Sequence, residues 1–300
     1  MNIHHHAIFT YRTAIAYQPG VTRRDPSPVI RVGNTYFVWY SKSLTDETGY
    51  DATIWYATST DGLLWNEQGE ALARGTAGTW DEHAVFTPTI LVADARYFIF
   101  YTAVPEPFDN DFGGPHATAT AIGAAVADNP HGPWKRLPSN PILRPGIGRE
   151  FDSHRVDDAC LVVRNHQFWL YYKGRRAGLS PLQTKMGLAI ADRPTGPYVK
   201  CGLNPLVNGG HEVCVFPWAS GVAAWVSPVG PAGNSVQYAA DGIHFQKIQN
   251  IVPPAAPGPY REDHYKNGIG PGIQWGLCHC THQTPRPYLL RFDCHDGPHA

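Results

Sequence analysis

A repeated strand–turn–strand pattern constrains this chain more than any other feature of its sequence. Residues 25–40 read as a short strand, a Gly-Asn turn and a second strand of alternating large apolar residues, which is typical of a β-hairpin. Residues 157–172 match this segment without a gap, residues 86–101 fit the same alignment, and residues 212–227 fit it more loosely. The chain is therefore expected to repeat one β-unit.

A second pair of strands follows each hairpin. It begins with a strand and a turn rich in Asp, Gly and Pro, after which an aromatic residue opens the next strand. These aromatic residues are Trp65, Trp134, Tyr198 and Phe245, and we interpret them as packing residues. Units of about four strands that recur every few tens of residues are typical of a β-propeller.

A fifth unit, from Tyr260 onward, is incomplete. It offers two candidate strands, residues 272–278 and 287–293, and the lone β-prone segment at residues 7–17 is the candidate to complete it. Sharing one blade between the two chain ends would close the ring and leave no open edge. We therefore predict an all-β, five-bladed β-propeller, with residues 1–300 as a single domain.

The composition excludes several classes of protein. Charged residues make up only 16% of the chain and the formal net charge is −1, so no basic surface points to nucleic acid or an anionic membrane. No run of about 18 apolar residues is present, so no membrane span is expected.

The N-terminus lacks the basic segment and apolar run of a secretory signal. We therefore expect a cytoplasmic protein, or a periplasmic or secreted one if a leader has been removed. Residues 1–6 end in three histidines and are interpreted as a disordered or tag-like end. The run Cys278-His279-Cys280 resembles a metal motif, but ligands one residue apart point to opposite faces of a strand, so we expect no metal ion there.

Acidic residues start three of the four complete units. The position that opens each unit holds Asp25, Phe86, Asp157 and Glu212 in turn. A charge at the start of an otherwise apolar strand is costly unless it has partners or a function. Because the first strand of each blade lines the central channel, we expect these three carboxylates to meet at one mouth of it. Such a pocket suits glycoside hydrolysis, in which one carboxylate activates water and an acid protonates the leaving oxygen.

Histidines and arginines accompany these acids. His83 and His154 lie at equivalent places, three residues before the start of their units, either as sugar contacts or as hydrogen-bonded structural residues. Arg24 and Arg155 lie beside the acids, where we expect them to lower the pKa of the carboxyl groups and to donate to sugar hydroxyls.

Five short motifs carry a resemblance to a known family. They are RRDPSPVI, FTPTI, SHRVDDAC with the following KGR, TKMG and GHEVC, and they span residues 23–214. With them the chain resembles the five-bladed propeller glycosidases similar to family 43. More closely it resembles glycoside hydrolase family 117, the exo-acting α-1,3-(3,6-anhydro-L-galactosidases) of agar breakdown. The resemblance implies that residues 1–300 form a catalytic domain that acts on an oligosaccharide.

The resemblance also implies an inverting mechanism. Asp25 would be the general base and Asp157 a supporting acid, with Asp158 as the competitor for that second role. The agar enzymes imply His211 as the general acid, which an adjacent glutamate would keep protonated, whereas the arabinan and xylan relatives imply Glu212. The sequence leaves both residues open as the acid.

The implied reaction is the release of 3,6-anhydro-L-galactose from the non-reducing end of neoagaro-oligosaccharides. The alternatives are a family 43-like α-L-arabinofuranosidase or β-xylosidase, and a sugar-binding propeller without catalytic activity. The expected substrate contacts are Arg24, His83, His154, Arg155, Lys173 and His264, with ligation of a central ion as the alternative for His264. We expect no cofactor, with a structural divalent ion in the channel as an alternative, and a monomer or homodimer that binds neither nucleic acid nor membrane.

Overall fold

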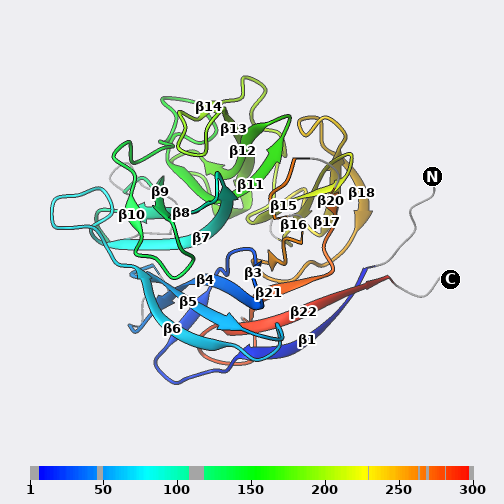
Figure 1. The fold of residues 1–300 in the computed structure, drawn as a ribbon. Helices are drawn as coiled ribbons and strands as arrows, with labels where there is room; N and C mark the ends of the chain where they lie inside the picture. The colour runs from blue at the N-terminus through cyan, green and yellow to red at the C-terminus, as the bar shows by residue number, and fades with distance from the viewer. Residues whose placement is uncertain are drawn as a thin grey trace.

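The computed structural model consists almost entirely of β-strands. It describes residues 7–45, 50–107, 118–228, 230–262, 264–267, 270–280 and 282–296. Five sheets stand around a central axis as the blades of a propeller (Figure 1). The predicted all-β, five-bladed fold is therefore confirmed, whereas the expectation for residues 1–6 lies outside the described residues.

Each of the first four blades runs from an inner strand at the axis to an outer strand at the rim. Blade 1 contains β2 (Thr22–Arg24), β3 (Ile30–Val32), β4 (Thr35–Ser43), β5 (Thr53–Ser59) and β6 (Asn66–Leu72). Blade 2 contains β7 (Ala84–Ala93), β8 (Arg96–Val104), β9 (Ala121–Ala127) and β10 (Lys135–Arg136). Blade 3 contains β11 (Arg155–Arg164), β12 (Gln167–Arg175), β13 (Lys185–Ala191) and β14 (Val199–Lys200), with the 3-10 turn η1 (Pro181–Gln183) before β13. Blade 4 contains β15 (Val213–Ala219), β16 (Gly221–Val226), β17 (Ser235–Ala239) and β18 (Gln246–Asn250), and β20 (Gly270–Pro271) pairs with β15.

Blade 5 joins the two ends of the chain (Figure 1). It contains β19 (Gly258–Pro259), β21 (Trp275–Cys280), β22 (Tyr288–Asp296) and β1 (Ala7–Ile15). β1 pairs with β22 in antiparallel register, from Ala7 opposite Asp296 to Ile15 opposite Leu289. The prediction that the N-terminal strand completes the last blade is confirmed, and β22 has a neighbour on both sides.

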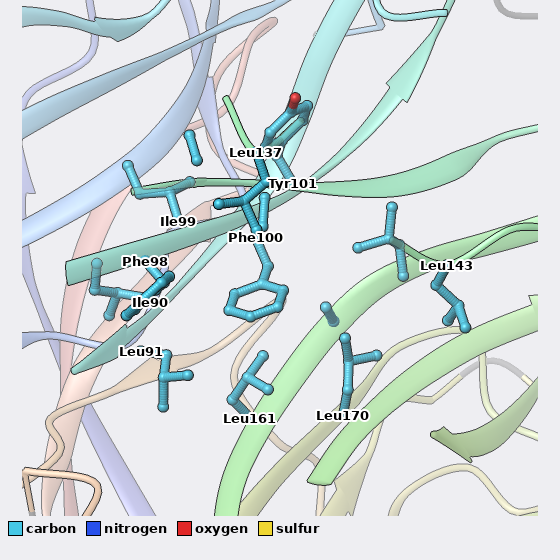
Figure 2. Close-up of a cluster of buried hydrophobic side chains, with 14 of the residues drawn as sticks. Ile90, Leu91, Phe98, Ile99, Phe100, Tyr101, Leu137, Leu143, Leu161 and Leu170 are labelled. Atoms are coloured by element: carbon cyan, nitrogen blue, oxygen red, sulfur yellow. The ribbon is translucent and has the colours of Figure 1, made fainter. Parts of the chain in front are cut away.

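Aromatic residues at the blade turns pack one blade on the next, as predicted. Three of them, each after the third strand of its blade, meet the second strand of the preceding blade. The edge-to-face pairs are Trp134 with Trp39, Tyr198 with Phe100 and Phe245 with Tyr171, with ring centroids 5.7, 5.9 and 6.1 Å apart. Figure 2 shows the same interface between blades 2 and 3, where Phe100 lies close to Leu161 and Leu170.

A β-bulge interrupts the inner strand of blade 3. On β11 the pairing passes from Asp157 opposite Lys173 to Cys160 opposite Tyr171, so two residues face one. The first bulged residue, Asp158, has a left-handed backbone with φ of 49°.

The same backbone conformation recurs in blades 1 and 2 and corrects the ungapped alignment of the sequence. Thr87 has φ of 46° and Asp25 has φ of 51°. Asp25 therefore corresponds to Asp158, and Asp157 corresponds to Arg24, which pairs with β4 as Asp157 pairs with β12. The alignment is wrong here because the Pro-Ser-Pro segment of blade 1 is longer by a residue than the bulge of blade 3.

Candidate active site

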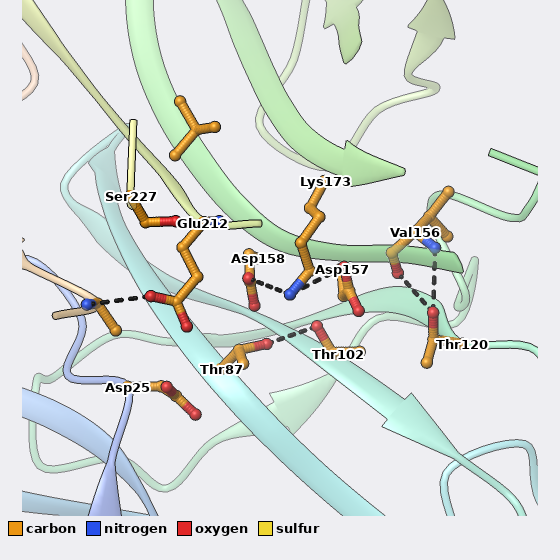
Figure 3. A network of polar contacts seen from close by, with 12 residues as sticks. Asp25, Thr87, Thr102, Thr120, Val156, Asp157, Asp158, Lys173, Glu212 and Ser227 are labelled. Atoms are coloured by element: carbon orange, nitrogen blue, oxygen red, sulfur yellow. Dashed lines mark hydrogen bonds and ion pairs between the residues drawn. The ribbon is translucent and has the colours of Figure 1, made fainter. Parts of the chain in front are cut away.

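One mouth of the central channel gathers carboxylates from three blades. Asp25 follows β2, Asp157 and Asp158 lie on β11, and Glu212 directly precedes β15. All four line the same cavity, and Figure 3 shows their carboxyl groups gathered around it. The structure thus brings together the acids that the sequence placed at the starts of the units, and it adds Asp158.

Asp25 is held by the arginine that precedes it. Arg24 Nε donates to Asp25 Oδ2 at 2.8 Å, and both side chains are largely buried. Burial alone would raise the pKa of Asp25, but the Arg24 guanidinium and His279 together outweigh it and hold the pKa well below its ordinary value. Asp25 is therefore ionised at neutral pH.

Lys173 on β12 lies between the two adjacent carboxylates of β11. Its Nζ is 2.6 Å from Asp158 Oδ2 and 3.6 Å from Asp157 Oδ1 (Figure 3). Burial alone would lower the pKa of Lys173, but the two aspartates raise it, so the side chain stays a cation. Burial raises the pKa of Asp157 to about 6, although Lys173 opposes this shift. By these distances Asp158 is the closer partner of Lys173 and Asp157 the more distant one.

Glu212 has the opposite environment to Asp25. Burial raises the pKa of Glu212 above its ordinary value; the negative charges of Asp158 and Asp25 act in the same direction, whereas His279 and Lys173 oppose the rise. The Ala256 N–H donates to Glu212 Oε2 at 3.2 Å, and the Glu212 N–H donates to Ser227 Oγ at 2.9 Å. The glutamate is thus fixed by its neighbours and tends to keep a proton.

His211 lines the same cavity but is neutral. Lys173 lowers the pKa of His211 to about 3, and burial, Arg175 and Arg24 act in the same direction. The expectation that the adjacent Glu212 keeps His211 protonated is therefore wrong, because the cations of the mouth dominate its surroundings.

The predicted basic contacts lie where the sequence placed them. Arg24, Arg155 and Lys173 line the cavity together with Arg175, which the sequence reasoning did not single out. Tyr50 also lines it, and the Arg24 guanidinium lies 5.1 Å from the centre of that ring. The mouth therefore combines anionic and cationic groups with an aromatic wall.

The three other predicted histidines do not line this cavity. His83 and His154 lie just before β7 and β11, and burial lowers the pKa of His154 to about 4, so that it is a neutral core residue. His264 is exposed and lies outside the lining of the mouth. Their roles as sugar contacts are not supported by this placement.

Blade 5 contributes His279 instead. This buried residue of β21 places Nδ1 3.2 Å from the backbone nitrogen of Asp25 and 3.4 Å from its Oδ1. In the sequence, His279 stands out only as the centre of a Cys-His-Cys run. Successive side chains of a strand point to opposite faces, which argues against a zinc site in this run. The same alternation puts His279 on the face opposite Cys278 and Cys280, and from it His279 could have been predicted as a site residue.

A larger hollow lies on the outer part of blade 3, away from these acids. Its buried carboxylate, Asp152, is bound by Lys200 Nζ at 2.6 Å and by the Tyr172 hydroxyl at 2.7 Å. Blade 2 repeats this arrangement with Asp81, Arg136 and Tyr101, so it is a structural element of the blades. We therefore place the candidate active site at the channel mouth.

Two expected absences concern the described residues alone. Among them, no group of three or more His, Cys, Asp or Glu side chains is placed to hold a metal ion. No helix in this part of the chain has the length and apolar character needed to cross a membrane. The expectations about cofactors and a channel ion stay predictions.

The class of protein follows from the fold, the acidic mouth and one family profile. Residues 22–178 match the profile described as Glycosyl hydrolases family 32 N-terminal domain. A five-bladed propeller with converging carboxylates and this match is a propeller glycosidase.

The family follows from a solved structure. The chain is similar to Zg3597, a family 117 glycoside hydrolase produced by the marine bacterium Zobellia galactanivorans, with 31% sequence identity and a TM-score of 0.87. The match covers 98% of this chain and 93% of that one. The chain belongs to glycoside hydrolase family 117.

More distant structures share the fold alone. Fructan 1-exohydrolase IIa from Cichorium intybus is 12% identical with a TM-score of 0.62, over 94% of this chain and 57% of that chain. The alpha-L-arabinofuranosidase from Lactobacillus brevis is 12% identical with a TM-score of 0.59, over 90% of each chain. No curated protein matches this chain in sequence.

Proposed function

We propose that this glycosidase is an exo-acting, inverting enzyme that releases 3,6-anhydro-L-galactose from the non-reducing end of neoagaro-oligosaccharides. The observation that carries the chemistry is the convergence of Asp25 and Glu212 on one cavity, where the surroundings lower the pKa of Asp25 and raise that of Glu212. Membership of family 117 supports the proposed identity of the sugar that is released.

Asp25 acts as the general base in this proposal. Its carboxylate takes a proton from a water molecule as that water attacks the anomeric carbon, while Glu212 gives its proton to the leaving glycosidic oxygen. Bond making and bond breaking then occur on opposite faces of the sugar, and the anomeric configuration inverts. Exchange of protons with solvent restores both carboxyl groups.

Glu212 is favoured over His211 as the general acid. The pKa of His211 is lowered to about 3, so its imidazole is neutral near neutral pH and has no imidazolium proton to give. Glu212 lines the same cavity as the base and has a raised pKa, which suits an acid. His211 then serves as a hydrogen-bonding contact for the sugar.

Asp158 is the supporting carboxylate rather than Asp157. It occupies the place in blade 3 that Asp25 occupies in blade 1, and its charge contributes to the raised pKa of Glu212. Asp157 is the more distant partner of Lys173, at 3.6 Å, and helps to anchor it. Asp158 therefore keeps the acid protonated between turnovers.

The test is hydrolysis of neoagarobiose compared with aryl α-L-arabinofuranoside and aryl β-xyloside. We expect cleavage of neoagarobiose alone, and NMR of the first-formed product should show the inverted anomer. Cleavage of only the aryl pentosides would contradict the proposed sugar and favour the arabinofuranosidase or xylosidase alternative. Initial formation of the retained anomer would contradict inversion.

A further inference from the structure

We propose that His279 is a positioning residue that holds both reacting carboxyl groups, the base through its side chain and the acid through its backbone. This inference rests on the proposed roles of Asp25 and Glu212. It assigns a catalytic contribution to blade 5, which supplies none of the four carboxylates of the mouth.

The contact with Asp25 is a hydrogen bond to the backbone. A backbone N–H can only donate, so at 3.2 Å from the Asp25 nitrogen the His279 Nδ1 acts as an acceptor, and we assign the ring proton to Nε2. His279 is buried, so removing this acceptor would leave the Asp25 N–H without a hydrogen bond in a place that water reaches poorly.

Asp25 needs such a restraint because of its backbone conformation. Its φ of 51° lies in the left-handed region, which is unfavourable for a residue with a Cβ. A residue persists there only when its surroundings determine the conformation. His279 holds the backbone and Arg24 holds the carboxylate, so together they fix where the base points.

The contact with Glu212 passes through one loop. The His279 N–H donates to the Ala255 carbonyl at 3.2 Å, and the next residue, Ala256, donates its N–H to Glu212 Oε2 at 3.2 Å. Ala256 also has a left-handed φ, of 43°. The strand that carries His279 therefore fixes the loop that binds the acid.

This hydrogen bond also selects the oxygen that carries the proton of the acid. Because Oε2 accepts from Ala256, the proton of a neutral Glu212 is favoured on Oε1. Glu212 then presents its proton from a defined atom. His279 of β21 thereby fixes the positions of Asp25 and Glu212 relative to each other.

A set of substitutions at His279 separates positioning from simple core packing. His279→Ala removes the acceptor, and we expect kcat to fall by about 10²-fold with KM nearly unchanged, since small displacements of reacting groups cost about that much. His279→Asn keeps an acceptor near the place of Nδ1 and should recover most of kcat. His279→Gln places its amide further along the side chain and should stay impaired.

Cys278→Ala is the matched control, because Cys278 is buried on the opposite face of the same strand. It should leave kcat unchanged even where it lowers the melting temperature. If His279→Ala does not fold, the comparison of the Asn and Gln variants decides. Equal kcat in these two variants, or wild-type kcat in a folded His279→Ala, would overturn the inference.

Asp25→Asn measured in parallel separates this inference from the proposed function. An inactive Asp25→Asn beside a fully active His279→Ala rejects the positioning role alone. An active Asp25→Asn rejects the assignment of the base and, with it, the positioning role.

Discussion

At the mouth of the channel, the charge of each carboxyl group follows from its immediate neighbours. Asp25 contacts Arg24, which favours its ionised form. Burial raises the pKa of Glu212, with the charges of Asp158 and Asp25 acting in the same direction and those of His279 and Lys173 opposing it. The inner strands of different blades meet at one channel mouth. They can therefore supply both a base and an acid from the same type of side chain.

The choice of acid predicts how the rate depends on the leaving group. Glu212→Gln should lower kcat/KM on the natural glycoside by about 10²–10⁴-fold, but much less on an aryl glycoside whose leaving group needs no proton. His211→Asn should lower the rate on both substrates to a similar extent. Steady-state kinetics on the two substrates make the comparison, and leaving-group dependence in the His211 variant instead would contradict the assignment.

The same assignment predicts the shape of the pH profile. Glu212 must be protonated, so kcat/KM should fall as pH rises through its raised pKa. Asp25 must be ionised, and because its pKa is held below the ordinary 3.8, the loss on the acidic side should begin below that value. Kinetics over pH check this, with Asp157→Asn as a control for the nearby group whose pKa is about 6. A basic limb that disappears in His211→Asn and persists in Glu212→Gln would be the opposite result.

At the scale of single elements, the bulge of β11 makes Asp158 the counterpart of Asp25, and we propose on this basis that Asp158 is the supporting carboxylate. Asp158→Asn should lower kcat by about 10²-fold or more, because it removes the carboxylate that supports the acid and binds Lys173 at 2.6 Å. Asp157→Asn should keep most of the activity, because Lys173 retains its closer partner. Values of kcat for the two variants make the comparison, with circular dichroism as a check of folding. An inactive Asp157→Asn beside an active Asp158→Asn would reject the correspondence of Asp158 with Asp25.

The sequence predicts hairpins well and bulges poorly, for a physical reason. The hairpin of residues 25–40 follows from local alternation and from turn residues, which are visible in one segment. The bulge at Asp158 depends on which backbone groups pair across β11 and β12, and no side-chain pattern records that pairing. Asp157 was therefore aligned with Asp25, one residue from its true counterpart.

At the scale of the whole molecule, the ring is closed by packing between the chain ends and blade 4. Phe9 on β1 meets Trp225 and Phe292 edge to face, with centroids 5.3 and 6.2 Å apart. Phe9→Ala should lower the free energy of unfolding by about 2–4 kcal/mol. Ile8→Ala is the control, since Ile8 is 44% exposed and should change stability by less than about 0.5 kcal/mol. Denaturant unfolding would contradict this role of Phe9 if both variants matched the wild type.

Closure of the ring could be predicted because the last blade lacks a strand and residues 7–17 form a lone β-prone segment. Pairing the two removes an unpaired sheet edge. His279 could not be assigned in the same way. Its partner, Asp25, lies at the other end of the chain, and the contact exists only because blade 5 stands beside blade 1. His264, the residue predicted for that place, is exposed instead.

The most direct test is the turnover of Asp25→Asn on the glycoside that the wild type cleaves, measured together with its affinity for that glycoside. We expect kcat to fall by at least about 10²-fold while binding is kept, since the substitution removes the base but preserves the shape of the mouth. Asp128→Asn, at a side chain that is 86% exposed on the rim, should behave like the wild type. Unchanged turnover in Asp25→Asn would contradict the claim that the carboxylates at the channel mouth carry out the hydrolysis.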